Sequence, residues 1–194
     1  MLQQILNDGR TLLGEDRLQV IENITSHIKH LPGSTAEVGV YKGGVSKLIA
    51  LLLPNKTHYC FDTFTGIPNA QPEIDNLMNG SFSTSYEEVV NYLKVCPNIV
   101  FKKGYFPDTT NDIKDRFCLV HLDGDTYRTT IDALNFFYSK IVSGGHIILD
   151  DWKGKDTLGV EKAVREFFKD KPEQIEEQVP VQCFIIKLSK VKFL

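Results

Sequence analysis

The sequence has no apolar run long enough to cross a membrane and no excess of positive charge. Its longest apolar run covers only residues 48–53, whereas a membrane span needs roughly 20 residues. The formal net charge is −3, so no general basic field draws the chain to nucleic acid or acidic lipid. The start, Met1-Leu2-Gln3-Gln4, lacks the basic residues and cleavage site of a signal peptide. We therefore expect a cytoplasmic protein with no nucleic-acid partner and no membrane partner.

Cysteine pairs and metal-binding cysteine motifs are also missing. The four cysteines, at positions 60, 96, 118 and 183, form no CxxC pair and no zinc-ligand spacing. Cys60, Cys118 and Cys183 lie in apolar stretches typical of strands. We expect them to be reduced and to pack in a core.

The composition is that of a globular protein. The chain has 194 residues, of which 42% are hydrophobic and 24% are charged. These values exclude a disordered, collagen-like or coiled-coil chain as a whole. The length predicts a single domain over residues 1–194, with a helical segment at residues 1–31.

Short apolar runs alternate with amphipathic helical patterns along most of the chain. Strands are expected at residues 35–40, 57–63, 99–105, 118–123 and 146–151, and helices at 16–31, 45–53, 86–95, 127–141 and 160–169. Two last strands, at 174–179 and 182–188, leave no room for a helix between them. The pattern predicts an α/β fold with a mostly parallel sheet, helices on both faces and one reversed edge strand.

One connection is unusually long for a compact domain. Residues 66–85 contain Pro68, Pro72 and several asparagine and glycine residues, but no periodic pattern. Connections of this length are usually functional or disordered. Because this one leaves the sheet where ligands bind, we interpret it as a lid loop.

A glycine-rich turn follows the first expected strand. The run Ala36–Ser46 reads AEVGVYKGGVS, and its glycines would let the backbone approach a ligand at a helix N-terminus. It matches neither the G-x-G-x-x-G dinucleotide fingerprint nor a P-loop. A tight turn without a ligand stays an alternative.

Acidic residues end the other central strands. Asp62 ends the second strand, where nucleotide-binding folds place a residue for the ribose hydroxyls, although a capping or turn aspartate is equally consistent. Asp123, Asp125, Asp150 and Asp151 follow two strands whose carboxyl ends share one edge of the sheet. Carboxylates brought together repel one another unless a cation lies among them, and oxygen ligands suit Mg²⁺ or Ca²⁺. The alternative is a set of unrelated, solvated carboxylates.

The order of five segments resembles the macrocin O-methyltransferase (TylF-type) family. The segments are 36–46, 62–68 (DTFTGIP), 104–109 (GYFPDT), 121–127 and 144–152, and the similarity runs from about Arg10 to Phe168. The resemblance implies a Rossmann-like class I methyltransferase with a seven-stranded, mostly parallel sheet and an antiparallel terminal strand. It further implies S-adenosyl-L-methionine as methyl donor and Mg²⁺ as metal.

The resemblance also implies roles for individual residues. The methionine end of the cofactor falls to the turn that contains Glu37, Gly39, Tyr41, Gly43 and Ser46. Asp62, with its neighbours Thr63 and Phe64, would bind the ribose, and Tyr105 and Phe106 would flank the adenine. Mg²⁺ would be held by Asp123, Asp150 and Asp151, of which Asp123 would also contact the cofactor.

The catalytic base is left open by the resemblance. Related catechol-type enzymes carry a lysine three residues after the first metal aspartate, and this chain has Thr126 there. Asp123 and Asp125 are the candidate catalytic residues.

The leading hypothesis is therefore an O-methyltransferase for a sugar hydroxyl or similar vicinal diol, with a glycoside or nucleotide sugar as small-molecule acceptor. A catechol-type enzyme with a planar acceptor and a catalytically silent cofactor-binding module are the alternatives. Association into a homo-oligomer also stays open.

Overall fold

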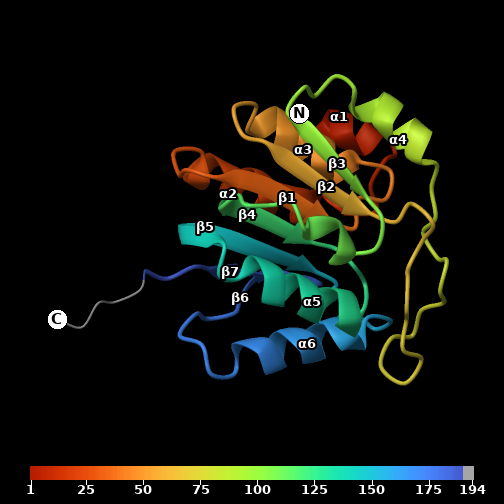
Figure 1. Cartoon of the computed structure of the whole chain (residues 1–194), viewed down its shortest axis with the longest axis vertical. Coiled ribbons are helices and arrows are strands. Elements are labelled where there is room, and N and C mark those ends of the chain that lie inside the picture. Colours follow the sequence, from red (N-terminus) through yellow and green to blue (C-terminus); the bar gives the residue numbers. More distant parts are fainter. Residues whose placement is uncertain (190–194) are drawn as a thin grey trace.

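A computed structural model of the chain describes residues 1–189; the last five residues of the predicted domain, 190–194, lie outside the described part. Seven strands form one sheet in the order β3-β2-β1-β4-β5-β7-β6. Helices lie on both sides of this sheet (Figure 1). The predicted α/β class is confirmed.

The elements follow the predicted alternation. The strands are β1 (Ser34–Val38), β2 (His58–Asp62), β3 (Ile99–Lys103), β4 (Phe117–Leu122), β5 (Ile141–Asp150), β6 (Glu176–Val179) and β7 (Gln182–Ile186). The helices are α1 (Leu2–Asn7), α2 (Glu15–Ile28), α3 (Gly44–Leu52), α4 (Tyr86–Leu93), α5 (Tyr127–Phe137) and α6 (Leu158–Phe168), with a short 3₁₀ turn, η1, at Asp108–Thr110.

The reversed strand differs in position from the prediction. Strands β1 to β5 are parallel, and β7 runs antiparallel to β5, with Leu149 opposite Cys183. However, β7 lies between β5 and β6, and β6 forms the edge of the sheet. The apolar strand β7 is mostly buried, whereas β6 exposes Glu176 and Glu177. Charged side chains suit an edge strand better than an inner strand, which explains the order.

Strand β5 also begins earlier than expected. The sequence predicted a helix over 127–141 and a strand over 146–151, but α5 ends at Phe137 and β5 starts at Ile141, so that Gly144 and Gly145 belong to the strand. Ile141 pairs with Phe117 of β4, with an irregularity in register before the next pair. The glycines thus lie in an irregular stretch of strand, where a missing side chain allows close backbone approach.

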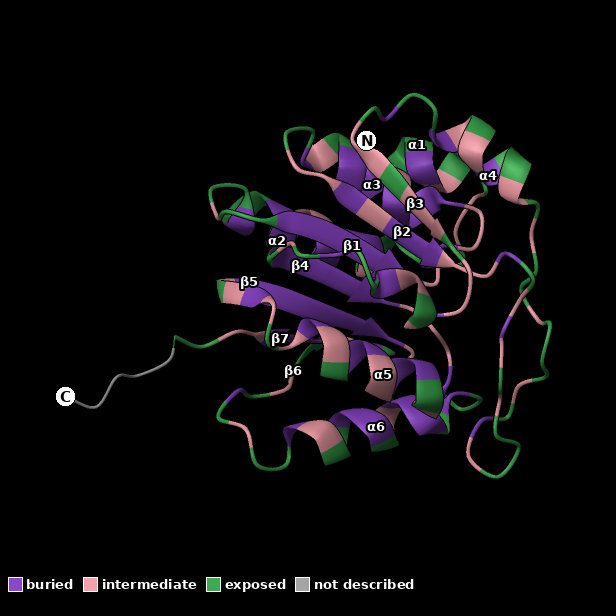
Figure 2. Cartoon of the chain, viewed as in Figure 1, coloured by how far each residue is buried: buried purple, intermediate pink, exposed green. Residues whose placement is uncertain are grey.

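Two large apolar cores cover the two faces of the sheet, and a third, smaller cluster packs α4 against β2 and β3. Helices α1, α2 and α3 pack on one face, and α5 and α6 pack on the other. Every residue of β4 is buried, as expected for a central strand covered on both faces. Figure 2 shows the buried sheet between helices whose outer sides are exposed. The predicted helix cover on both faces is confirmed.

The cysteines and the membrane prediction can be compared with the structure as well. All four cysteines are buried and unpaired. Within residues 1–189, no helix combines the length and the apolar character needed to cross a membrane.

We predict that Gly39→Ala severely destabilises the fold. Gly39 has φ +88, and a Cβ there would lie 1.8 Å from the backbone oxygen of Asp123. The variant would have to separate the ends of β1 and β4, which are joined by the Asp123 N–H to Val38 carbonyl bond of 2.9 Å. Urea denaturation should show a loss well beyond the roughly 1–2 kcal/mol expected for a left-handed alanine alone.

Gly9→Ala is the matched control. Gly9 also has a positive φ, +62, but an added Cβ would meet nothing within 4 Å. Equal unfolding free energies for the two variants would contradict the proposed collision between β1 and β4.

Candidate active site

A cavity lies at the carboxyl ends of β1, β2, β4 and β5. It collects most of the residues that the sequence singled out. They are Glu37, Gly39, Tyr41, Asp62, Thr63, Tyr105, Phe106, Asp123, Asp125, Asp150 and Asp151. Parallel strands end at one edge of the sheet, which is where open α/β folds bind ligands.

Three predicted cofactor residues lie outside the cavity lining: Gly43, Ser46 and Phe64. A Cβ on Gly43 would touch Leu93 of α4, so this glycine lets α4 approach the turn. Phe64 is buried and packs on Tyr86, with ring centroids 5.0 Å apart. These positions indicate support for the turn rather than contact with a ligand in the cavity.

Ser46 belongs to a buried polar network under the cavity. Its hydroxyl donates to one carboxylate oxygen of Glu37, and Nδ1 of His121 lies 3.0 Å from the other. All three residues are almost completely buried. Both oxygens of Glu37 are therefore already engaged below the turn, although its side chain also borders the cavity. The network fixes β1 against β4 and α3.

The Asp62 carboxylate organises the wall of the cavity. Its Oδ2 accepts the backbone N–H groups of Val40 (2.7 Å) and Tyr41 (2.9 Å), and its Oδ1 accepts that of Phe64 (2.6 Å). Burial raises the pKa of Asp62, and these backbone hydrogen bonds oppose the rise. Asp62 is thus a turn aspartate, one of the two roles predicted from the sequence. An ionised carboxylate has about four acceptor positions, so Oδ1 can still accept a ligand hydroxyl.

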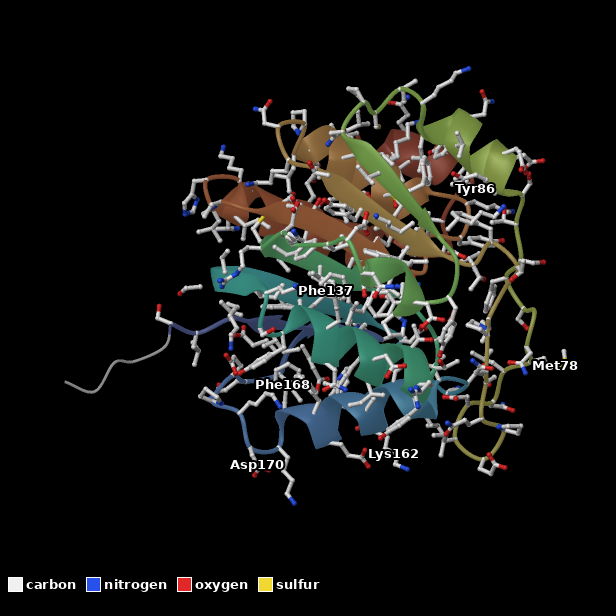
Figure 3. All side chains as sticks on the ribbon, viewed as in Figure 1. Met78, Tyr86, Phe137, Lys162, Phe168 and Asp170 are labelled. Carbon is white, nitrogen blue, oxygen red and sulfur yellow. The ribbon has the colours of Figure 1, made fainter. Side chains whose placement is uncertain are left out.

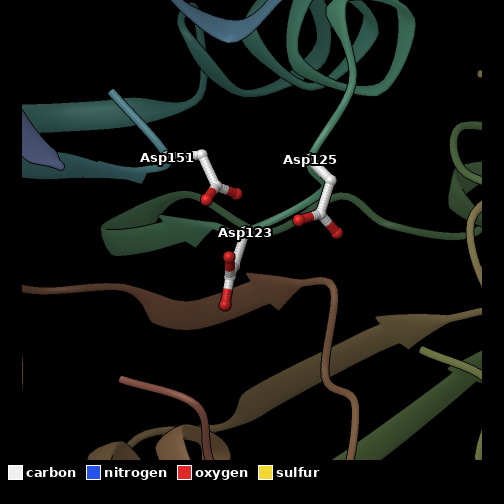
Figure 4. Close-up of side chains that lie close together, drawn as sticks. All are labelled: Asp123, Asp125 and Asp151. Carbon is white, nitrogen blue, oxygen red and sulfur yellow. The ribbon is translucent and has the colours of Figure 1, made fainter. Parts of the chain in front are cut away.

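Three carboxylates converge at the other side of the cavity. Asp123, Asp125 and Asp151 each offer an oxygen within 4.8 Å of the others (Figure 4). Oδ2 of Asp151 is buried and has no hydrogen-bond partner. Burial and the neighbouring carboxylates raise the pKa values of Asp123 and Asp125 well above the usual range. We name Asp123, Asp125 and Asp151 the acidic group.

Asp150, which the resemblance assigns to the metal together with Asp123 and Asp151, is not part of the acidic group, and its metal role stays a prediction. Its Oδ2 is paired with Arg17 of α2, and its Oδ1 accepts the side-chain amide of Gln182 at 3.1 Å. Asp125, predicted as a candidate catalytic residue, is the third member of the acidic group. Burial raises the pKa of Asp150 to about 6, although the charges of His121 and Arg17 oppose the rise.

The remaining wall is aromatic and apolar. Phe106 is buried against Phe61 and Phe137, with centroid separations of 5.3 and 5.7 Å. At the mouth, Phe82 meets Tyr41 edge-on at 6.1 Å. Both mouth aromatics have a left-handed backbone, with φ values of 61 and 50, a rare state for bulky residues.

Several lining residues had no sequence signal. Arg10, Thr11, Leu12, Leu13 and Arg17 come from the N-terminal segment, and Phe82 comes from the 66–85 connection. The carbonyl of Arg10 accepts the N–H of Gly44 at 3.0 Å, which places the segment beside the start of α3. No residue pattern in the sequence distinguishes Arg17 from the other arginines and lysines.

Comparison with known proteins gives a consistent result. Demethyldecarbamoylnovobiocin O-methyltransferase of Streptomyces niveus is 29% identical over 77% of this chain and 68% of its own length. Mycinamicin III 3''-O-methyltransferase of Micromonospora griseorubida is 27% identical over 74% of this chain and 65% of its own length. The chain thus spans about two thirds of these relatives.

The fold comparison agrees. The solved structure of the O-methyltransferase NovP superposes with a TM-score of 0.84, at 24% identity, over 93% of this chain and 83% of that one. Residues 5–181 match the family described as Macrocin-O-methyltransferase (TylF). Because that match covers most of the chain, and the fold has the expected seven-stranded sheet, the chain belongs to the macrocin O-methyltransferase (TylF) family.

Proposed function

We propose that the protein is an S-adenosylmethionine- and Mg²⁺-dependent O-methyltransferase that acts on a sugar hydroxyl. The observation that carries this proposal is the single cavity that joins the Asp62 turn to the acidic group. One side of it suits a nucleoside-containing cofactor, and the other suits a cation and an acceptor oxygen. The unpaired cysteines agree with action in a reducing compartment such as the cytoplasm.

The cofactor would occupy the half of the cavity next to β1, β2 and β3. Asp62 offers Oδ1 to the ribose, and Tyr105 with Phe106 borders the place for the adenine. The turn at Gly39 and Tyr41, next to Glu37, borders the methionine end. Because Gly39 has no side chain, the turn passes close to the backbone of Asp123, which brings the two halves of the cavity together.

The acidic group is chemically suited to Mg²⁺. The buried, unpartnered Oδ2 of Asp151 needs a positive partner, because an isolated buried carboxylate oxygen is costly. Asp123 and Asp125 supply further oxygen ligands, which match the preference of Mg²⁺. Asp150, adjacent to Asp151 in the chain, already accepts from Arg17 and Gln182, so only its remaining acceptor positions are open to a cation.

The chain's own residues orient the acceptor and accept its proton. When bound, S-adenosylmethionine supplies an electrophilic methyl group, and Mg²⁺ lowers the pKa of an acceptor hydroxyl. We propose Asp125 or Asp123 as the group that takes the hydroxyl proton. Both carboxylates belong to the acidic group, so they lie beside the place where an acceptor hydroxyl would approach the cation.

The mouth of the cavity favours an acceptor with an apolar part. Leu12 and Phe82 border the cavity, yet they are 62% and 43% exposed. Arg10 and Arg17 are the only cationic side chains among the described lining residues. Arg17 is paired with Asp150, and Arg10 lies over the Tyr92 ring at 5.2 Å.

A diphosphate would therefore find no unengaged cation in the described lining. We infer that an uncharged glycoside with an apolar aglycone fits better than a nucleotide sugar. The two relatives compared above carry names that refer to methylation of novobiocin- and mycinamicin-type compounds, which supports this choice.

We predict that Asp62→Asn weakens binding of S-adenosylhomocysteine about tenfold or more, because charge-assisted hydrogen bonds to the turn and the ribose are lost. Calorimetric titration measures the change. Asp112→Asn, at an exposed site where Asp112 pairs with Lys102, serves as the control. Equal affinities for both variants would refute the ribose assignment.

We predict that Asp151→Ala abolishes most methyl transfer and weakens Mg²⁺ binding about tenfold or more. Affinity for S-adenosylhomocysteine should stay within about twofold, because Asp151 lies in the cation half of the cavity. Titrations with each ligand and a labelled-cofactor assay measure these effects. Full wild-type activity in excess chelator would exclude a divalent cation from the reaction.

The raised carboxyl pKa values also predict a pH dependence. Burial raises the pKa of Asp150 to about 6 and raises that of Asp151, above the roughly 3.9 of an unfolded aspartate. Between these values the folded state keeps protons that the unfolded chain releases, so the metal-free protein loses stability as the pH rises through about 4 to 6. Saturating MgCl₂ should therefore raise the melting temperature more at about pH 8 than at about pH 5. An equal rise at both pH values would contradict the cation assignment.

A further inference from the structure

We propose that Asp75 is a positioning residue that fixes the acidic group by tying the 66–85 connection to the two loops that carry Asp125 and Asp151. The inference rests on the proposed function, because it concerns the residues assigned to the cation. It also changes the interpretation of the connection from a free lid to a segment held at its centre.

The Asp75 carboxylate is completely buried, at 0% exposure, in the middle of this long connection. Its Oδ1 accepts the backbone N–H of Tyr127 at 3.0 Å, and its Oδ2 accepts that of Gln71 at 3.0 Å. Such a carboxylate is costly to bury unless it is fully engaged. Here one oxygen of the Asp75 carboxylate accepts a backbone N–H at the start of a helix that is distant in sequence.

That helix begins beside the acidic group. Tyr127 is the first residue of α5, two positions after Asp125. The first backbone N–H groups of a helix lack partners within the helix and carry partial positive charge, so a carboxylate there is favourable. Asp75 thus fixes the start of α5 and, with it, the loop that contains Asp123 and Asp125.

The neighbouring residue reaches the second loop. Asn76 donates its backbone N–H to the carbonyl of Asp156 at 3.0 Å and its side-chain amide to the Asp156 carboxylate at 2.9 Å. Asp156 lies in the loop between Asp151 and α6. In Figure 1 the connection, drawn in yellow, runs beside the starts of α5 and α6.

Helix α6 leaves space for this contact. A Cβ on Gly159 would lie 2.0 Å from Oδ1 of Asp75 and 2.7 Å from the backbone nitrogen of Tyr127. Any side chain at position 159 would therefore push apart the carboxylate and the first residue of α5, and would break their hydrogen bond. Asp75, Tyr127 and Gly159 form one close-packed junction of three segments.

The two acidic residues need such support. Asp125 and Asp151 have left-handed backbones, with φ values of 60 and 64. Non-glycine residues persist in this state when the surrounding structure holds them there. Asp75 and Asn76 attach close to both residues, at the loops that set the distance between their carboxylates.

The experiment compares four variants in the full chain. Asp75→Ala removes the carboxylate, and Asp75→Asn keeps an acceptor oxygen. Gly159→Ala separates the carboxylate from the start of α5 without changing Asp75, and Met78→Ala is the control in the same connection. Met78 is 78% exposed and points away from the fold (Figure 3). The probes are Mn²⁺, titrated by electron paramagnetic resonance, and S-adenosylhomocysteine, titrated by calorimetry.

We expect Asp75→Ala and Gly159→Ala each to weaken Mn²⁺ binding about tenfold or more, as found when groups that orient metal ligands are lost. Their affinity for S-adenosylhomocysteine should stay within about twofold of the wild type. Retained binding of this ligand also shows that the variants are folded. Asp75→Asn keeps an acceptor oxygen for Tyr127 and should retain most of the Mn²⁺ affinity. Met78→Ala should match the wild type in both titrations.

Two outcomes would overturn the inference alone. One is unchanged Mn²⁺ affinity in Asp75→Ala and Gly159→Ala; the other is a parallel loss of both ligands with a lower melting temperature, which indicates a purely structural role. If the wild type itself binds no Mn²⁺, the cation assignment of the proposed function fails, and this inference fails with it.

Discussion

The repulsion among half-buried carboxylates at one edge of the sheet is the constraint on which the site depends. Parallel strands β4 and β5 end side by side, so Asp123, Asp125, Asp150 and Asp151 share one small region. The chain neutralises only one of the four with its own cation, by pairing Asp150 with Arg17. The other three stay without a cationic partner in the described residues, and their raised pKa values express that cost. A site with this unrelieved repulsion is suited to a positively charged ligand, because such a ligand would offset the repulsion.

Much of the fold could be predicted because strand and helix periodicities are strong in this sequence. All seven strands and the main helices lie near their predicted positions. The order of the last two strands could not be predicted, since the hairpin pattern fixes that β6 and β7 are antiparallel but not which one joins β5. Burial decided it: the apolar β7 is placed inside, and the glutamates of β6 are placed at the edge.

The sequence predicts which residues at the strand ends lie together in the site, but not the hydrogen bonds that these residues make. Asp62, Asp123 and Asp151 line the cavity because topology puts strand ends together. The engagement of Asp150 could not be predicted because its partner, Arg17, comes from a helix over 100 residues away in sequence. Contacts at that separation leave no local pattern. The contact between Asp75 and α5 leaves no local pattern either, since Asp75 is one acidic residue in a polar connection.

The two halves of the cavity are held by different forces. The wall around Asp62 is built from backbone N–H groups that bond to one carboxylate, so it forms as the chain folds and needs no added ion. The opposite side consists of three carboxylates that repel one another, and two of them, Asp125 and Asp151, lie on residues with a left-handed backbone. Under the proposed function, the first half is therefore preorganised for the cofactor, whereas a bound cation would relieve the repulsion in the second half. This difference means that the proposed function predicts cofactor affinity and cation affinity to change independently, even though both ligands would share one cavity.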